Sequence, residues 1–201
     1  MAGLKQIFVL LIVLLLLVQA VIGFASQQHY AAWLAEARKR GWRFQPQPWW
    51  RRWRRQYRLA GTTPQGAVWE LRRVQRSGVF LFRWVTYDKP LPYGSLLLLP
   101  QARALAEPKQ RDLQPVQLED VSWQARFLLL ATHQRLGERY VGVAVRHFLH
   151  MWPLWPQVGA LEDVQWNQTR LLINGRFDRN WETIDRIVAL GTALVEEAVE
   201  E

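Results

Sequence analysis

The sequence predicts an α+β protein in which an N-terminal transmembrane helix precedes one small domain with a mostly antiparallel sheet and a long C-terminal helix. Three observations support this prediction. Residues 7–25 form an uninterrupted apolar run, short strand-like segments separated by turn signals follow from residue 57, and apolar side chains recur every three or four positions over residues 181–199. These patterns are typical of a membrane span, an antiparallel meander and an amphipathic helix, respectively.

The same observations divide the chain into three parts. A transmembrane anchor over residues 1–25 is followed by a helical stalk with a basic Trp/Arg segment over residues 26–56, and then by an α+β domain over residues 57–201. The length beyond the apolar run suits one domain with its own core. The chain has no cysteine, which excludes disulfides, thiol catalysis and Cys-ligated metal centres.

The apolar run carries no charge, and about 20 helical residues span the roughly 30 Å hydrocarbon core of a bilayer. An alternative is a cleaved signal peptide, with Lys5 as its basic start and residues 23–25 as the cleavage site. Under the positive-inside rule, the cluster Arg38, Lys39 and Arg40 predicts a single-pass membrane protein whose C-terminal domain is cytoplasmic. Cleavage would instead export the domain.

A helix is expected over residues 26–40, because this stretch is rich in alanine, ends in basic residues and meets Gly41. It either stands alone or continues the membrane helix into water as a stalk. Pro46 and Pro48 interrupt it, and a short helix over residues 49–57 is expected to begin after Pro48.

Strands are expected where aromatic and β-branched residues alternate between turn signals. They cover residues 57–63, 67–75, 79–87, 95–99 and 123–132, with a closing hairpin of residues 164–166 and 170–174. Residues 102–116 predict a loop. Two helices complete the domain, over residues 136–151 and over residues 181–199, where Ile184, Ile187 and Gly191 belong to the apolar stripe.

The positive charge is concentrated in one block. Of the 26 Lys and Arg residues, nine lie between Arg38 and Arg58, and no acidic residue interrupts them, so the rest of the chain is balanced against its 17 acidic residues. Such a block usually indicates an anionic partner.

Part of the chain resembles a known group of proteins. The residues concerned are the stalk motif at positions 34–44, Tyr-Arg-Leu-Ala-Gly-Thr-Thr at 57–63, Gly-Ala-Val-Trp-Glu-Leu at 66–71, and the strand–helix unit from Arg170 onward. Together they resemble a loose group of uncharacterised bacterial proteins, often membrane-linked, over most of residues 30–199. The resemblance implies an α+β domain and brings no activity and no functional residue with it.

The basic block contains the main candidate binding segment, in which tryptophans share a helix face and arginines occupy the rest. Its residues are Trp49, Trp50, Arg51, Arg52, Trp53, Arg54 and Arg55. Trp favours the membrane–water interface and Arg pairs with phosphates, so this segment is predicted to contact anionic lipid headgroups. The alternatives are packing of the tryptophans on the domain's own sheet and binding to an acidic surface of a larger membrane complex; nucleic acid is not expected.

Other candidates for chemistry do not form a recognisable motif. His147 and His150 are three residues apart, with His133 nearby, but no metal-binding signature accompanies them. Glu70, Asp88 and Asp178 are the candidate acid–base carboxylates, but Glu70 lies in an expected strand, and turn or capping roles explain Asp88 and Asp178. We therefore expect a non-enzymatic interaction or scaffold protein without a cofactor or metal, and an enzyme with a site assembled from scattered residues is the remaining alternative.

Overall fold

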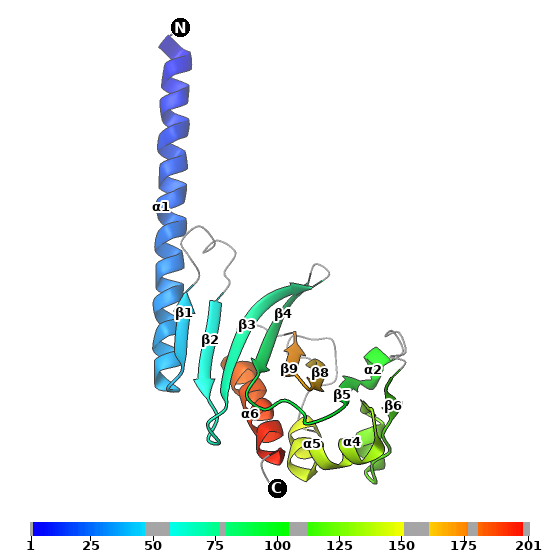
Figure 1. Cartoon of the computed structure of the whole chain (residues 1–201). Coiled ribbons are helices and arrows are strands. Elements are labelled where there is room, and N and C mark those ends of the chain that lie inside the picture. Colours follow the sequence, from blue (N-terminus) through cyan, green and yellow to red (C-terminus); the bar gives the residue numbers. More distant parts are fainter. Residues whose placement is uncertain are drawn as a thin grey trace. The chain divides into compact units, whose positions relative to one another are not determined.

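A single long helix, α1 (Ala2–Lys39), makes up most of the first of two compact units, Met1–Tyr57 and Arg58–Glu201. The computed structural model describes residues 2–46, 57–76, 79–104, 112–150, 161–176 and 181–198, which are the coloured ribbons of Figure 1.

The end of α1 confirms the predicted glycine stop. Gly41 has a φ of 70°, the N–H of Gly41 donates to the carbonyl of Arg38, and the N–H of Trp42 donates to the carbonyl of Ala37. This pair of bonds is a Schellman motif, which closes a helix at a residue in the left-handed conformation. Strand β1 (Arg43–Pro46) follows.

The N-terminal part of the predicted fold class is wrong. The apolar run of residues 7–25 and the stalk of residues 26–40 both belong to α1, whose last turn carries Arg38 and Lys39. Among the residues that the structure describes, no helix combines the length and the apolar character needed to cross a membrane. The transmembrane anchor over residues 1–25 and the single-pass membrane localisation with a cytoplasmic domain are therefore not supported.

The second unit contains an antiparallel sheet with the strand order β2-β3-β4-β9-β8-β5-β7-β6. Its strands are β2 (Tyr57–Thr62), β3 (Val68–Arg76), β4 (Val79–Thr86), β5 (Ser95–Pro100), β6 (Gln114–Pro115), β7 (Phe127–Ala131), β8 (Leu161–Asn167) and β9 (Leu171–Gly175). The predicted meander of the first three strands and the closing hairpin are confirmed.

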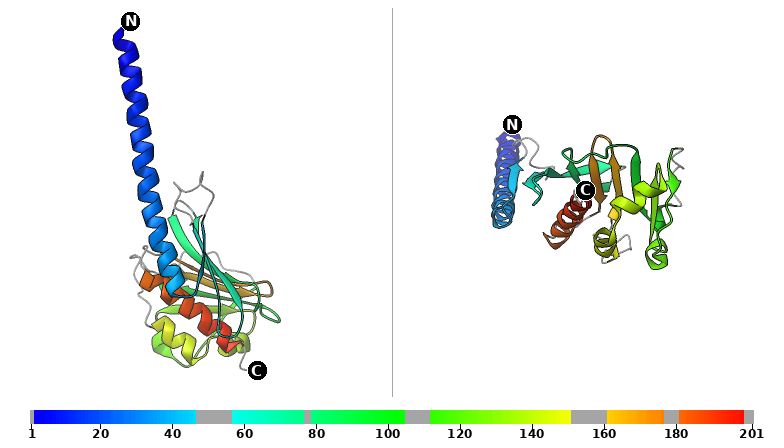
Figure 2. Two further views of the ribbon diagram at one scale, coloured as in Figure 1. Left: turned by 90° about the vertical axis from the view of Figure 1, so that its left-hand side faces the viewer. Right: turned by 60° about the horizontal axis from the view of Figure 1, so that its bottom comes forward.

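Helices accompany the sheet along its length. They are α2 (Gln101–Ala104), α3 (Val121–Gln124), α4 (Gln134–Tyr140), α5 (Val143–His150) and α6 (Trp181–Glu197). Figures 1 and 2 show α5 and α6 on the same side of the sheet, and the two helices contact each other. The apolar stripe of the long C-terminal helix predicted this burial, since Ile184 and Ile187 are fully buried.

The core is organised by the register of the sheet. Leu71 pairs with Trp84, Trp84 with Ile173, and Ile173 with Val164, so these four side chains point to the same face in neighbouring strands. All four are buried. This row of four side chains joins the meander to the closing hairpin. Helix α6 contacts β4, the strand that carries Trp84.

Two predicted elements are divided in the structure. The helix expected over residues 136–151 is split into α4 and α5 around Gly142, where a Cβ would lie 2.6 Å from Cδ of Glu197 in α6. Glycine also lowers helix propensity, which is consistent with a break at this position. The strand expected over residues 123–132 begins with α3 instead, because Asp120 caps this short helix.

The loop expected over residues 102–116 also contains regular structure in its described parts, namely the end of α2 and strand β6. Strand β6 pairs with the edge of β7, and its two residues are exposed. Polar, proline-containing sequence of this kind does not predict a strand, and here pairing with a buried neighbour determines the conformation.

Candidate functional site

The binding segment predicted from the sequence lies outside the described residues. It comprises Trp49, Trp50, Arg51, Arg52, Trp53, Arg54 and Arg55. Residues 49–56 of the short helix expected over residues 49–57 also lie outside the described residues, and Tyr57, its expected last residue, instead begins β2. The contact of the binding segment with lipid or with a protein partner therefore stays a prediction.

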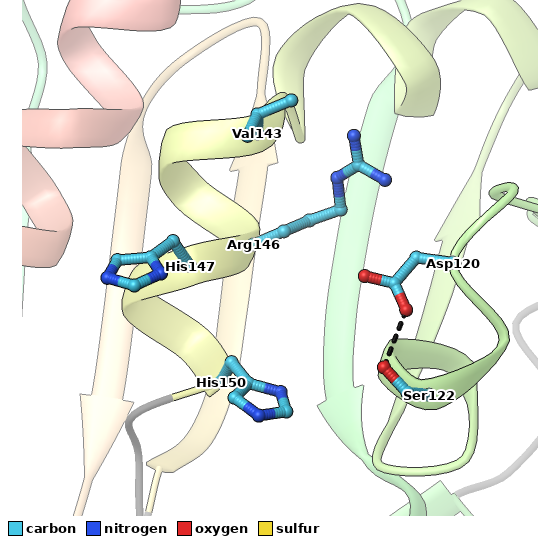
Figure 3. Close-up of a pocket in the computed structure, with 6 residues that line it drawn as sticks. All are labelled: Asp120, Ser122, Val143, Arg146, His147 and His150. Carbon is cyan, nitrogen blue, oxygen red and sulfur yellow. Dashed lines mark hydrogen bonds between the residues drawn. The ribbon is translucent and has the colours of Figure 1, made fainter.

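The described structure contains an open groove of about 370 Å³ between α3 and α5 (Figure 3). The side chains that line it come from the start of α3 and from one face of α5. They are Asp120, Ser122, Val143, Arg146, His147 and His150.

One wall of the groove carries Asp120, whose side chain is held in place because it caps the start of α3. The Oδ1 atom of Asp120 accepts a hydrogen bond from the backbone N–H of Trp123 at 3.0 Å and another from Oγ of Ser122 at 2.7 Å. The Ser122 hydroxyl, the Trp123 N–H and the charge of Arg146 lower the pKa of Asp120 below its ordinary value. Asp120 is therefore a carboxylate at neutral pH, with both of these bonds on one of its oxygens.

The opposite wall is one face of α5. Val145 and Leu149 are fully buried, so the positions between them at helical spacing face outward. Figure 3 shows that Arg146 and His150 extend toward the wall that carries Asp120 and Ser122, whereas the ring of His147, which also lines the groove, points away from that wall.

Arg126 links the two walls of the groove through a hydrogen bond. Its Nη1 atom donates a hydrogen bond at 2.6 Å to the carbonyl of His150, the last residue of α5. Arg126 follows α3 directly, and its guanidinium lies 5.9 Å from the ring centre of Phe127 at the start of β7. The end of α5 is thereby held against the segment that leads from α3 into the sheet.

The charges of the groove face each other without pairing directly. Among the described residues no ion pair joins Arg146 to Asp120, although the charge of Arg146 lowers the pKa of Asp120. The hydrogen bond described for Arg146 runs from Nε to the carbonyl of Gly142 at 3.4 Å. The groove therefore presents donors on one wall and a carboxylate on the other.

The structure brings together two of the three candidate histidines. His147 and His150 line the groove, while His133 occupies the N-cap position of α4 and lies beside Tyr93, with a ring-centre distance of 6.4 Å. Within the described ranges, no group of three or more His, Asp and Glu side chains is placed to hold a metal ion.

The two candidate carboxylates that the structure describes, Glu70 and Asp88, form ion pairs or a backbone hydrogen bond. Glu70 in β3 pairs with Arg58 in β2 and with Arg72 two residues along its own strand. Asp88 accepts the backbone N–H of Val68 at 2.6 Å. Asp178 lies outside the described residues.

Sequence reasoning missed a buried polar cluster in β8 and β9. Glu162 pairs with Arg103 and, at 2.5 Å, with Nε of Arg176, and only 6% of its side chain is exposed. The neighbouring Asp163 accepts a hydrogen bond from Nδ2 of Asn174 at 2.6 Å. The available signal was the pair of consecutive carboxylates inside an apolar strand, where a β-bulge between Leu161 and Asp163 accommodates them.

The comparisons with known proteins identify the fold. No protein-family model matches the chain, and no curated protein sequence matches it. A solved structure, the crystal structure of the mycobacterial trehalose monomycolate transport factor A, TtfA, resembles this chain with a TM-score of 0.54 and 12% sequence identity. The match covers 83% of this chain and 92% of that chain, and at this identity it shows that the two proteins share a fold.

Proposed function

We propose that this protein is a non-enzymatic lipid-binding protein whose Trp/Arg segment, residues 49–55, contacts anionic lipid headgroups. The observation that carries the proposal is the basic block between Arg38 and Arg58, with nine cationic residues, three tryptophans and no acidic residue. A basic residue near an anionic membrane surface contributes about 1 kcal/mol of binding free energy. Tryptophan adds an amphipathic ring suited to the headgroup region.

Two further observations support this function. The fold resembles that of a protein named as a trehalose monomycolate transport factor, which is a lipid-related role. The candidate catalytic carboxylates Glu70 and Asp88 are engaged in an ion pair and in a backbone contact. Both observations favour binding over catalysis.

The proposal is tested by co-flotation of the full chain with lipid vesicles. We expect stronger binding to vesicles that contain phosphatidylglycerol than to pure phosphatidylcholine vesicles, which report binding that is independent of headgroup charge. Raising the ionic strength from about 0.1 M to about 1 M shortens the Debye length from about 10 Å to about 3 Å and should remove the difference.

Substitution of Arg51, Arg52, Arg54 and Arg55 by Ala should weaken binding to anionic vesicles on the order of 100-fold or more, since four charges are lost. The matched control removes four positive charges elsewhere, at Lys89, Arg135, Arg170 and Arg186, and should keep most of the binding. If both variants lost the same amount of vesicle-binding affinity, net charge alone would explain the binding, and the proposal would be overturned.

Binding to an acidic protein surface is the competing outcome of a second measurement. Pull-down from native membranes with the wild type and with the Trp49→Ala/Trp53→Ala variant would show a stable protein partner that depends on the tryptophans. Such a partner, combined with absence of charge-dependent vesicle binding, would favour an accessory subunit of a larger complex.

A further inference from the structure

We propose that the groove between α3 and α5 binds a small zwitterionic phosphate ester, with the phosphate against Arg146 and His150 and the amine against Asp120. This inference goes beyond the proposed function, because the groove contains none of the residues 49–55 and its ligand is a single molecule. The juxtaposition that supports it is a donor-rich wall facing a carboxylate across an open groove (Figure 3).

The donor wall suits a phosphate. The described hydrogen bond of Arg146 is made by Nε, so its terminal nitrogens remain available to a ligand, and a guanidinium binds phosphate oxygens through two parallel bonds. His150 is exposed, lies one helical turn further along α5 and points to the same side. Its ring supplies an additional N–H donor.

The carboxylate wall requires a donor from the ligand. The side chain of Asp120 lines the groove, and the lowered pKa of Asp120 keeps its carboxyl group charged at neutral pH. A simple anion such as inorganic phosphate would meet this negative charge without a compensating contact. A ligand that carries an ammonium group next to its phosphate satisfies both walls.

Contacts within the protein fix the geometry of the groove. Asp120 is fixed as the cap of α3, and Arg126 holds the end of α5 at the carbonyl of His150. A site whose walls are already fixed loses less conformational freedom on binding.

The test is titration of the full chain with phosphoethanolamine, inorganic phosphate and ethanolamine, followed by calorimetry and by NMR of the His150 ring. Phosphoethanolamine should bind at least about tenfold more tightly than either fragment, since each fragment satisfies one wall alone. Equal affinity for phosphate and phosphoethanolamine, or the absence of binding by all three probes, would overturn the proposal.

Two substitutions separate the walls. Asp120→Asn keeps a residue that caps helices as well as aspartate does, so α3 should remain intact while the charge is lost. It should weaken phosphoethanolamine binding about tenfold and leave phosphate binding unchanged or stronger. Arg146→Gln should weaken both, and Arg135→Gln, on the exposed surface of α4, should weaken neither. Unchanged binding in Arg146→Gln would contradict the assignment.

The same chemistry occurs in a free metabolite and in a phospholipid headgroup. Comparison of glycerophosphoethanolamine with monomeric dihexanoyl phosphatidylethanolamine distinguishes these sources. Val143, at one end of the groove, is 74% exposed and offers an apolar contact to an acyl chain. Tighter binding of the acylated probe, reduced by Val143→Ser, identifies a lipid, whereas equal binding identifies a free headgroup as the ligand.

Discussion

Gly191 in α6 lies directly against the indole ring of Trp84 in β4. A Cβ atom at position 191 would come within 2.6 Å of Cε2 and Cζ2 of Trp84, which is closer than non-bonded carbon atoms approach. Trp84 is fully buried at the centre of the sheet. The missing side chain at position 191 therefore sets how closely the C-terminal helix packs on the core.

Gly191→Ala is expected to lower the free energy of unfolding. Overpacking of a filled core costs about 1–3 kcal/mol, which exceeds the gain of about 1 kcal/mol in helix propensity from glycine to alanine. Chemical denaturation measures the difference. Combination with Trp84→Leu supplies the control: the double variant should lose less than the sum of the two single variants, and strict additivity would contradict a direct clash.

This contact shows what periodicity predicts and what it does not. The three-to-four spacing of apolar residues placed Gly191 on the buried face of a C-terminal helix, and that helix and its burial are confirmed. Why glycine occupies the position depends on Trp84, more than 100 residues earlier in the chain. Pairings of this kind are tertiary, and a single sequence does not reveal them.

Glu162→Gln is expected to destabilise the domain by about 1–3 kcal/mol, the range for a buried polar group that loses its charged partner. The substitution removes the carboxylate shared by Arg103 and Arg176 and leaves two guanidinium groups without their common counter-charge. Urea denaturation of the purified variant gives the free energy of unfolding.

The matched control for this substitution is Glu182→Gln. Glu182 pairs with Arg186 one helical turn away, and 66% of its side chain is exposed, so removal of its charge should change stability by less than about 0.5 kcal/mol. Equal effects at both positions would show that the buried ion pairs of Glu162 contribute nothing specific.

Ser122→Ala is expected to raise the pKa of Asp120 toward its ordinary value of about 3.9, because the Ser122 hydroxyl is the largest cause of its lowering. A lowered carboxyl pKa in the folded state stabilises the protein above the pKa of the unfolded chain, and this contribution is lost as the pH falls through the folded value. The wild type should therefore be more stable than Ser122→Ala at neutral pH, and the difference should shrink as the pH falls below about 4 and vanish once the pH is below the lowered pKa of the folded state.

The carboxyl carbon resonance of Asp120, followed by NMR, measures this pKa directly. An unchanged Asp120 titration in Ser122→Ala would mean that the backbone N–H of Trp123 and the charge of Arg146 determine its pKa.

The groove could be predicted only in part. The spacing of His147 and His150 indicated a shared helix face, and the structure places both on the groove. Asp120 and Arg146 carried no such signal, because their proximity depends on how α3, the sheet and α5 are arranged. The apolar run of residues 7–25 indicated an anchor when read alone, but among the described residues no helix is long and apolar enough to cross a membrane.

Arg126→Gln is expected to loosen the end of α5 without unfolding the domain. The substitution removes the guanidinium that donates to the carbonyl of His150. This carbonyl is at the end of α5 and has no partner within the helix, so the last turn loses a stabilising hydrogen bond. Amide hydrogen exchange should become faster in α5 and remain unchanged in α6, which is buried by its own apolar stripe.

Because Arg146 and His150 lie on this helix, the same variant should also bind phosphoethanolamine more weakly than the wild type. Arg135→Gln, which removes an equal charge from the exposed surface of α4, should change neither exchange nor binding. Faster exchange throughout the sheet would instead show that Arg126 stabilises the whole domain, since its guanidinium also lies over Phe127 at the start of β7.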